Sequence, residues 1–224
     1  MNILFLDIEA TDLNADIGNL LSIGYKWQDE KKVHVLSVLE HPGKNLNDDR
    51  PLLKAFEPIF QKADLVVHHF GDYYDIPFLQ TRRLVHGMPP MPSVKTVDTW
   101  RICKKHLRFG SNRLQRVLDA LKCPYQKTPL RLSVWADARV GIKSAIKYII
   151  THNYWDVKVL EWVYNKLAPV YPSHPKIVAS PGNKYCPLCG GASRSLGHYV
   201  GLVHRVQRRI CKKCGKSWRG DRIS

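Results

Sequence analysis

Two pairs of closely spaced cysteines near the end of the chain constrain its fold more than any other feature. Each pair has the form Cys-x-x-Cys-Gly, and 21 residues separate the pairs. Such a tight turn aims two sulfur atoms at one point, and the glycine eases the turn. The pattern predicts one structural Zn²⁺ held by Cys186, Cys189, Cys211 and Cys214. Two disulfides in a secreted module are the alternative, which the lack of a signal-peptide pattern disfavours.

The segment around these cysteines is expected to form a zinc ribbon over residues 184–224. Its strands are predicted at 199–203 and 206–210. So small a unit buries little apolar area, so the metal should supply much of its stability. His198 and His204 are expected at its surface, because four thiolates already complete the zinc shell.

A proline-rich stretch separates this ribbon from the rest of the chain. Residues 169–183 contain four prolines together with serine and glycine, a composition typical of an extended linker. We therefore expect a larger domain over residues 1–168, followed by the linker and the ribbon. Cys103 and Cys123 of the larger domain lie apart from the paired cysteines and are predicted to be core residues.

The net charge is strongly positive and unevenly distributed. The chain has 35 Lys and Arg against 19 Asp and Glu, a formal charge of +16. Residues 183–224 hold 10 Lys and Arg and one acid, Asp221, which gives +9 and leaves +7 for the rest. This excess predicts a nucleic-acid partner, and a protein docked on the ribbon is the competing explanation for its charge. No apolar run approaches the ~18 residues of a membrane span, so no membrane partner is expected and a cytoplasmic or nucleoid-associated protein is predicted, not a secreted one.

The larger domain has the pattern of an α/β protein. Apolar strand-like runs occupy 2–10, 19–27, 32–40, 64–70 and 95–100, and helical spacing occupies 49–63, 76–86, 114–122 and 143–167. Three consecutive strands followed by alternating helices and strands predict a mixed sheet flanked by helices. The glycine-rich loop of P-loop and dinucleotide-binding enzymes is missing, which disfavours both classes.

Two acids interrupt the first apolar run. Asp7 and Glu9 are two residues apart, so the period of a strand places both on one face. Neighbouring carboxylates in an apolar setting are costly unless a cation compensates them, and Mg²⁺ and Mn²⁺ prefer oxygen ligands. A strand end whose acids reach solvent is the alternative.

Two further acids occupy positions suited to the same ion site. Asp75 stands at the start of a helix that has Pro77 near its first turn, a place where an acid both caps the helix and faces a ligand. His152 and Asp156 are one helical turn apart and share a face. The alternatives are a simple helix cap for Asp75 and an exposed helix charge for Asp156.

Together these motifs resemble the DEDD superfamily of 3′–5′ exonucleases, DnaQ-like enzymes of ribonuclease H-like fold. The resemblance spans residues 3–165 and rests on Asp7-x-Glu9, on Tyr74-Asp75-Ile76-Pro77-Phe78-Leu79, and on Asp156 preceded by His152. It implies that Asp7, Glu9, Asp75 and Asp156 hold two Mg²⁺ or Mn²⁺ ions. It also implies that Thr11, Asp12 and Leu13 line the pocket for the terminal nucleotide, with Phe78 as an apolar wall.

The sequence departs from this superfamily in two places. The superfamily has a tyrosine four residues, or a histidine five residues, before the last aspartate, whereas His152 stands four before it. His152 is expected to deprotonate or orient the attacking water, with Tyr148 and Tyr154 as alternatives. The asparagine usual before the second motif is replaced by His69-Phe70-Gly71.

The expected reaction is two-metal hydrolysis of single-stranded 3′ ends of DNA or RNA, releasing nucleoside 5′-monophosphates. The alternatives are a catalytically silent binding or assembly factor that docks a partner through the ribbon, and a structure-selective endonuclease. Asp98 is predicted to be a structural cap. A stretch with Trp100 and Phe109 contains cations that suit single-strand binding: Lys104, Lys105, His106, Arg108, Arg113 and Arg116.

Overall fold

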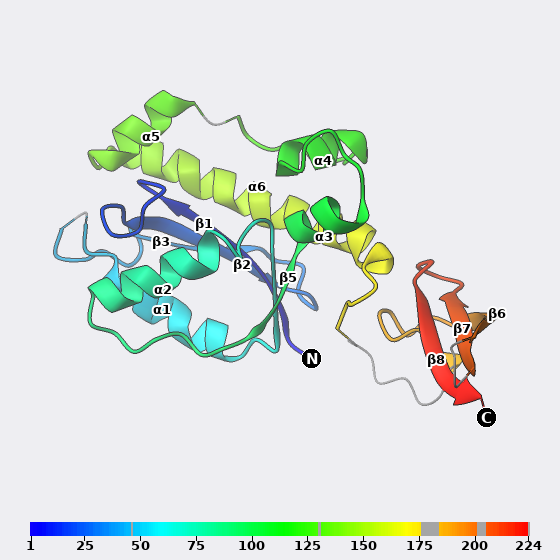
Figure 1. Cartoon of the computed structure of the whole chain (residues 1–224). Coiled ribbons are helices and arrows are strands. Elements are labelled where there is room, and N and C mark those ends of the chain that lie inside the picture. Colours follow the sequence, from blue (N-terminus) through cyan, green and yellow to red (C-terminus); the bar gives the residue numbers. More distant parts are fainter. Residues whose placement is uncertain (46, 130, 176–183, 201–204, 224) are drawn as a thin grey trace.

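A mixed five-stranded sheet forms the centre of the larger part of the chain (Figure 1). The computed structural model describes residues 1–45, 47–129, 131–175, 184–200 and 205–223. The sheet order is β3-β2-β1-β4-β5, in which β2 runs antiparallel to both β1 and β3, whereas β1, β4 and β5 run parallel to one another. The strands are β1 Ile3–Ala10, β2 Leu20–Trp27, β3 His34–Ser37, β4 Leu65–His68 and β5 Lys95–Asp98.

Helices cover both faces of this sheet (Figure 1). α1 and α2 pack on one face, and the long α6 crosses the other, beside three shorter helices. On β1 the faces divide by the strand period: Ile3 and Phe5 pack with α6, and the Phe5 ring meets Tyr164 edge-on at 5.4 Å. The bounds are α1 Arg50–Gln61, α2 Asp75–Val85, α3 Thr99–His106, α4 Leu114–Ala120, α5 Leu132–Arg139 and α6 Lys143–Leu167.

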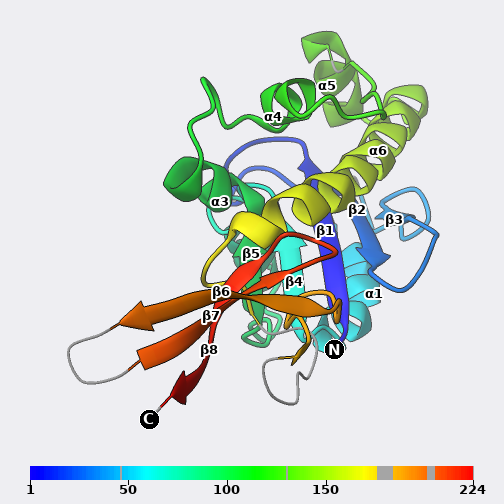
Figure 2. The ribbon, with the colours of Figure 1, turned by 90° about the vertical axis from the view of Figure 1, so that its right-hand side faces the viewer.

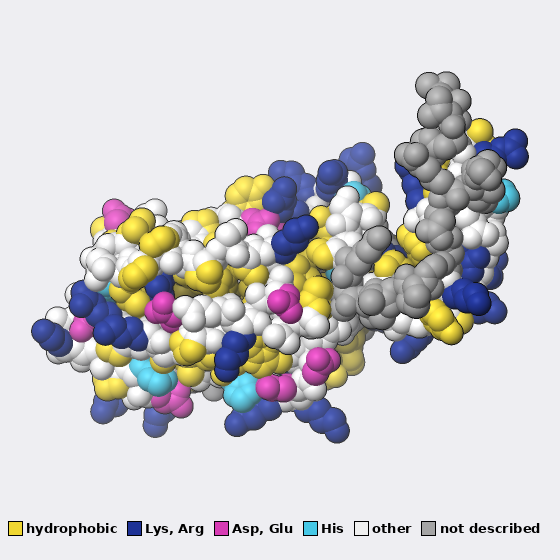
Figure 3. All heavy atoms as spheres, turned by 90° about the horizontal axis from the view of Figure 1, so that it is seen from below, with side chains coloured by type: hydrophobic (Ala, Val, Ile, Leu, Met, Phe, Trp, Pro, Cys, Tyr) yellow, Lys and Arg dark blue, Asp and Glu magenta, His cyan; other side chains and the backbone are white. Residues whose placement is uncertain are grey.

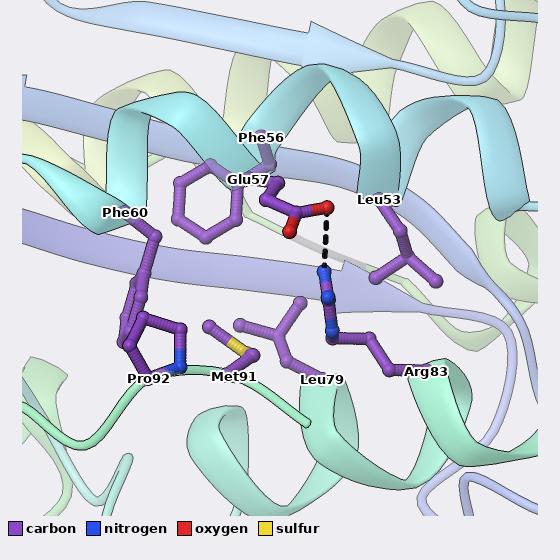
Figure 4. Close-up of a pocket in the computed structure, with 8 residues that line it drawn as sticks. All are labelled: Leu53, Phe56, Glu57, Phe60, Leu79, Arg83, Met91 and Pro92. Carbon is purple, nitrogen blue, oxygen red and sulfur yellow. Dashed lines mark hydrogen bonds and ion pairs between the residues drawn. The ribbon is translucent and has the colours of Figure 1, made fainter. Parts of the chain in front are cut away.

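An ion pair lies among apolar side chains where α1 and α2 pack together (Figure 4). Arg83 of α2 donates from Nη1 to Glu57 Oε2 of α1 at 3.3 Å. The hollow beside this pair measures about 10 Å³, which is room for about one water molecule. Apolar side chains surround it: Leu53, Phe56, Phe60, Leu79, Met91 and Pro92. This contact is therefore packing on the face opposite α6.

The strand predicted at 95–100 ends two residues early. Asp98 accepts hydrogen bonds from the backbone amides of Trp100 and Arg101 and so begins α3, which the sequence analysis did not predict. The prediction that Asp98 is a structural cap is confirmed. The strand predicted at 32–40 is likewise shorter, because only His34–Ser37 pairs with β2.

The ribbon contains a separate three-stranded antiparallel sheet beyond the end of α6 (Figure 2). Its strands are β6 Ser193–Val200, β7 Arg205–Cys211 and β8 Ser217–Ile223. The strand predicted at 206–210 lies within β7, whereas the one predicted at 199–203 begins earlier, at Ser193, and its last residues lie outside the described ranges. The β8 strand was not predicted.

Residues 168–192 connect α6 to the ribbon sheet. The 3₁₀ turn Ala168–Val170 follows α6, and residues 176–183 of the expected linker lie outside the described residues. Lys216 of the ribbon donates from Nζ to the Tyr171 carbonyl at 2.7 Å and is only 3% exposed. Among the described residues no helix combines the length and the apolar character that a membrane crossing requires.

Candidate active site

The β1 strand has a partner on only one side along its second half. It pairs with β2 from Leu4 to Ala10, but its parallel pairing with β4 stops at Phe5. The amide of Ile8, beyond that point, donates to Asp75 Oδ1 at 3.0 Å. Because Asp75 is the first residue of α2, a carboxylate takes the place of the missing strand. The site therefore lies at the carboxyl ends of β1 and β4, where open α/β sheets usually bind ligands.

Asp7 and Glu9 face α6, as the strand period predicts. They continue the face of Ile3 and Phe5, and both are partly exposed, whereas the Ile8 side chain between them is buried. The polar groups of α6 lie opposite them at this point. The change from apolar residues to acids along one face of β1 thus creates the site.

Asn153 of α6 fixes the orientation of Asp7. Its amide nitrogen donates to Asp7 Oδ2 at 2.6 Å and to the Asp7 carbonyl at 3.2 Å. Its amide oxygen accepts from the Ser22 hydroxyl of β2 at 3.2 Å. Asn153 is completely buried, and its hydrogen bonds hold the carboxylate against rotation.

Gly24 allows α6 to come this close to the sheet. It lies opposite Asp7 in the β1–β2 register. A Cβ atom at position 24 would lie 2.7 Å from Asn153 Oδ1 and 2.8 Å from Val157 Cγ2, closer than such atoms can approach. The absence of a side chain at Gly24 is therefore a condition for the contact between Asn153 and Asp7.

His152 and Asp156 lie beside Glu9, as the i, i+4 spacing predicts. His152 Nε2 is 3.7 Å from Asp156 Oδ2, and one ligand atom from each of Glu9, His152 and Asp156 lies within 4.8 Å of the others. His152 Nδ1 is 2.9 Å from Thr128 Oγ1. Burial lowers the pKa of His152 below its usual value, which favours the neutral imidazole.

The alternative tyrosines are not placed to serve this role. The Tyr148 hydroxyl donates to the Pro129 carbonyl at 2.6 Å. Tyr154 packs against the cluster of apolar residues around Val157 and meets the Trp155 ring at 5.5 Å. Of the three candidates, His152 is the one whose side chain contacts a site carboxylate.

The four acids form one electrostatic cluster. Burial, and after it the charges of Asp156, Asp75 and Glu9, raises the pKa of Asp7 well above its usual value. The pKa of Glu9 is also raised well above its usual value, mainly by burial. Burial raises the pKa of Asp75 to about 6. Carboxylates held this close need a compensating cation.

Lys127 supplies one positive charge to this cluster. Its Nζ atom lies 2.6 Å from Asp156 Oδ2, and its charge lowers the pKa of both Asp7 and Glu9. The sequence analysis missed Lys127, because it comes from the connection between α4 and α5 and belongs to no motif. A single ammonium does not balance four carboxylates.

The donor set fits a hard divalent cation. Asp156 Oδ1 is buried and has no hydrogen-bond partner among the described residues. An orphaned carboxylate oxygen beside other carboxylates is what Mg²⁺ or Mn²⁺ coordinates. The residues present thus fit the metal site predicted from the sequence.

The site opens onto a groove between α4 and α6. The groove has a volume of about 760 Å³. Its lining includes Lys122, Tyr125, Lys127, Thr128 and His152. Its charged side chains are two lysines and one acid, Asp119, so its balance of charge is positive, which suits the phosphates of a nucleic acid.

The residues predicted to bind the terminal nucleotide differ in their exposure to solvent and in their contacts. Thr11 is buried and exchanges hydrogen bonds with Asn19, and Asp12 Oδ2 accepts from Arg139 of α5 at 2.8 Å. Leu13 is 81% exposed. Phe78 is 3% exposed and packs in the core between the sheet and α1, so the structure does not place it on a pocket wall.

The four ribbon cysteines converge on one point. The Sγ atoms of Cys186 and Cys214 are 3.8 Å apart, and those of Cys189 and Cys211 are 3.6 Å apart. A tetrahedron with Zn–S bonds of about 2.3 Å has sulfur–sulfur edges of about 3.8 Å. All six cysteines of the chain are free thiols, so the disulfide alternative has no support here. The site fits one Zn²⁺.

Comparison with known proteins identifies the larger part of the chain. The family model of the RNase H superfamily matches residues 4–168. The chain belongs to the RNase H superfamily. The predicted resemblance and the RNase H-like fold are thereby confirmed, and membership of this superfamily supports a nuclease that acts on nucleic acid.

The RNase H-like fold is also found among solved structures. A family B DNA polymerase from the hyperthermophilic archaeon Pyrobaculum calidifontis matches with a TM-score of 0.58 and 16% sequence identity. The match covers 78% of this chain and 26% of the polymerase, so this chain spans about a quarter of that protein. No curated protein matches the sequence.

Proposed function

We propose that this chain is a metal-dependent 3′–5′ exonuclease that removes nucleoside 5′-monophosphates from single-stranded ends of DNA or RNA. The observation that supports it is the convergence of Asp7, Glu9, Asp75 and Asp156 beside His152 at the open edge of β1. The RNase H superfamily and the structural likeness to a polymerase support the broader class, a nuclease.

The proposed chemistry assigns a role to each polar group of the site. Two Mg²⁺ or Mn²⁺ ions held by the four carboxylates would activate the attacking water and stabilise the leaving 3′-oxygen. His152 donates from Nδ1 to Thr128 and accepts the proton of the water at Nε2. The water oxygen forms a bond to phosphorus, the bond from phosphorus to the 3′-oxygen breaks, and that oxygen takes up a proton. Asn153 keeps Asp7 in position throughout.

The ribbon is proposed to help hold the nucleic acid. Lys and Arg side chains lie over it at the right-hand end of Figure 3. The exposed cations of its described residues are Lys184, Arg194, Arg205, Arg208, Lys212, Lys213 and Arg219. Lys216, another of the ten Lys and Arg of residues 183–224, is buried against Tyr171 and does not face solvent. A protein partner on the ribbon remains the competing proposal.

One observation favours a catalytically silent binding factor as the second candidate. The Lys127 ammonium beside Asp156 offers the carboxylates a cation that belongs to the chain itself. A scaffold that never bound metal would need such a charge. Metal-dependent hydrolysis therefore decides between the two candidates.

The deciding experiment follows the products of labelled single strands. The intact chain is incubated with 5′-labelled and 3′-labelled DNA and RNA with Mg²⁺ or with EDTA. We expect metal-dependent release of mononucleotides from 3′ ends, and its loss in Asp7→Asn. The exposed Asp29→Asn, in the turn after β2, is the matched control and should keep the activity of the native chain.

The other outcomes are distinct. Internal cuts would replace the exonuclease by an endonuclease. Binding of nucleic acid without any metal-dependent cleavage would leave the silent binding factor.

A further inference from the structure

Three aromatic rings lie together on the surface next to the candidate active site. Tyr73 is 57% exposed and Phe70 is 42% exposed, and Trp100 of α3 lies against both. The ring centroids are 5.1 Å apart for Phe70 and Tyr73, 5.0 Å for Phe70 and Trp100, and 5.7 Å for Tyr73 and Trp100. We call Phe70, Tyr73 and Trp100 the aromatic platform. Exposed apolar clusters of this kind commonly mark binding sites.

The backbone beneath the platform is strained. Phe70 has a φ of 69°, in the left-handed region that an aromatic residue rarely adopts. Such strain costs about 1–3 kcal/mol and is found mainly at functional positions. Here it turns the Phe70 ring outward, although a conformation with ordinary φ would cost less.

A network of buried groups holds this strained loop in place. Asp98 accepts from the Phe70 amide at 2.9 Å, and Asp72 accepts from the Thr96 hydroxyl at 2.8 Å and from Arg101 at 2.7 Å. His68 is completely buried between the two acids, 3.2 Å from Asp72 and 3.7 Å from Asp98. His68, Asp72 and Asp98 together have the composition of a metal site, but the carboxylate oxygens of the two acids already accept the hydrogen bonds just described. The platform is thus rigid before any ligand arrives.

A lysine lies beside the platform. Lys104 Nζ is 4.8 Å from the centre of the Trp100 ring. Both residues belong to the stretch predicted to bind single strands, and most cations of that stretch are exposed: Lys104, Lys105, Arg108, Arg113 and Arg116. His106 is the exception, because it is partly buried beside Tyr171. Flat apolar rings among cations match a ligand that combines flat bases with phosphates.

The platform is continuous with the carboxylate cluster. The Tyr74 amide donates to the Phe70 carbonyl at 3.1 Å, and the Ile76 amide donates to the Gly71 carbonyl at 3.0 Å, so the loop turns directly into α2 and Asp75. A single-stranded nucleic acid whose 3′ end reached Asp75 would pass the aromatic platform within a few nucleotides of that end. In the superfamily an asparagine is usual in this loop, so the resemblance does not account for Phe70.

We propose that the aromatic platform stacks on unpaired bases of a single-stranded nucleic acid. The place of the strand's end relative to the platform rests on the proposed exonuclease function, but the stacking itself does not. Stacking on rings recognises every base, so the platform selects unpaired strands without selecting a sequence.

The test compares binding of oligomers that differ only in their bases. The full chain is titrated, without added Mg²⁺ or Mn²⁺ so that strands are not cleaved and without a chelator so that the ribbon keeps its zinc, with a fluorescent oligo-dT, an oligo-rU and an abasic DNA of equal length. We expect the native chain to bind the base-bearing strands at least about 10-fold more tightly than the abasic strand. Tyr73→Ala combined with Trp100→Ala should reduce this preference to about 1-fold to 2-fold. The ratio of the affinities for oligo-dT and oligo-rU shows whether the chain prefers DNA or RNA.

A matched control exists on α6. Lys166 Nζ lies 5.3 Å from the centre of the Trp162 ring, and the two residues are one helical turn apart. Trp100 and Lys104 have the same arrangement. Trp162→Ala should leave the base preference intact. Tyr73→Phe should also preserve it, because the ring remains, and the exposure of Tyr73 makes both substitutions at that position easy to accommodate.

The proposal is overturned if the native chain binds the abasic strand as tightly as oligo-dT. It is also overturned if a folded chain with Tyr73→Ala and Trp100→Ala, checked by circular dichroism, keeps the full preference. A base preference without mononucleotide release would remove the exonuclease but keep the platform. Mononucleotide release without a base preference would keep the exonuclease but remove the platform.

Discussion

The Lys127 ammonium lies 2.6 Å from Asp156 Oδ2, within a cluster of carboxylates that also contains Asp7 and Glu9. Lys127→Ala should therefore destabilise the metal-free chain, by up to about 3 kcal/mol, because the acids lose their cation. Mg²⁺ should restore more stability to this variant than to the native chain. Thermal unfolding with EDTA and with Mg²⁺ measures both effects. Lys158→Ala, whose lysine contacts the rings of Tyr125 and Trp155, is the control, and equal Mg²⁺ shifts in all chains would contradict the prediction.

Asn153 should be required for activity although it binds no metal in the proposed mechanism. Without its hydrogen bonds the Asp7 carboxylate rotates, and groups that orient a ligand in this way are worth about 10–100-fold. We expect Asn153→Ala to lower the rate of mononucleotide release by that factor, with little change in KM. Asn165→Ala replaces an exposed asparagine of the same helix and should be neutral. Equal rates for both variants would show that Asp7 does not need Asn153.

Gly24 and Gly110 should respond differently to the same substitution. Gly24→Ala forces a Cβ atom against Asn153 and Val157, which should cost about 1–3 kcal/mol of unfolding free energy and displace α6. At Gly110 a Cβ atom meets nothing within 4 Å, so Gly110→Ala should change stability little. Urea unfolding of both variants measures the difference, and similar midpoints would contradict the close packing of α6 on β2.

The ribbon should contain one zinc ion per chain. Cys186→Ser removes one of the four thiolates and should abolish stoichiometric zinc, measured by atomic emission on the purified chain. Cys123→Ser, outside the cluster, should leave the zinc content unchanged. Retention of zinc by Cys186→Ser would mean that other ligands hold it.

His69 should make the fold sensitive to acid. Burial lowers its pKa from 6.5 to about 4, although the hydrogen bond of its ring to the Asn112 carbonyl acts in the opposite direction. Between these values the unfolded chain binds a proton that the folded chain does not, so this contribution is complete above pH 6.5 and is lost as the pH falls toward about 4. The loss is at most about 3 kcal/mol.

The measurement is the unfolding free energy in urea between about pH 7 and pH 4.5. Because the raised pKa of Asp75 acts in the opposite sense, the native chain is compared with His69→Gln, which changes only the histidine contribution. The difference between the two chains should shrink as the pH falls. A difference that stays constant with pH would exclude the buried neutral histidine.

The acids of the site were predictable because local periodicity alone places them. A strand puts Asp7 and Glu9 on one face, and a helical turn puts His152 beside Asp156, whatever the rest of the chain does. The groups that complete the site were not predictable. Asn153 reaches Asp7 only because α6 crosses the sheet there, and Lys127 reaches Asp156 only because the connection between α4 and α5 passes beside α6; no local pattern encodes either arrangement.

The errors have similar causes. Phe78 is next to Asp75 in the motif, but the helical period turns its ring to α1 and the core. The β8 strand is rich in charge, so its pattern lacks the apolar alternation that marks a strand. The α3 helix was hidden because Asp98 ends β5 and begins the helix without an intervening turn.

The hydrogen bond that anchors Asp75 comes from the main chain of Ile8 and owes nothing to the isoleucine side chain. Every amino acid except proline carries that amide, so position 8 can change among apolar residues over evolution while the acid stays anchored. The geometry of the site therefore depends on where the pairing of β1 with β4 stops. A β1–β4 ladder that continued from Phe5 to Ile8 would occupy the place in which Asp75 now meets β1.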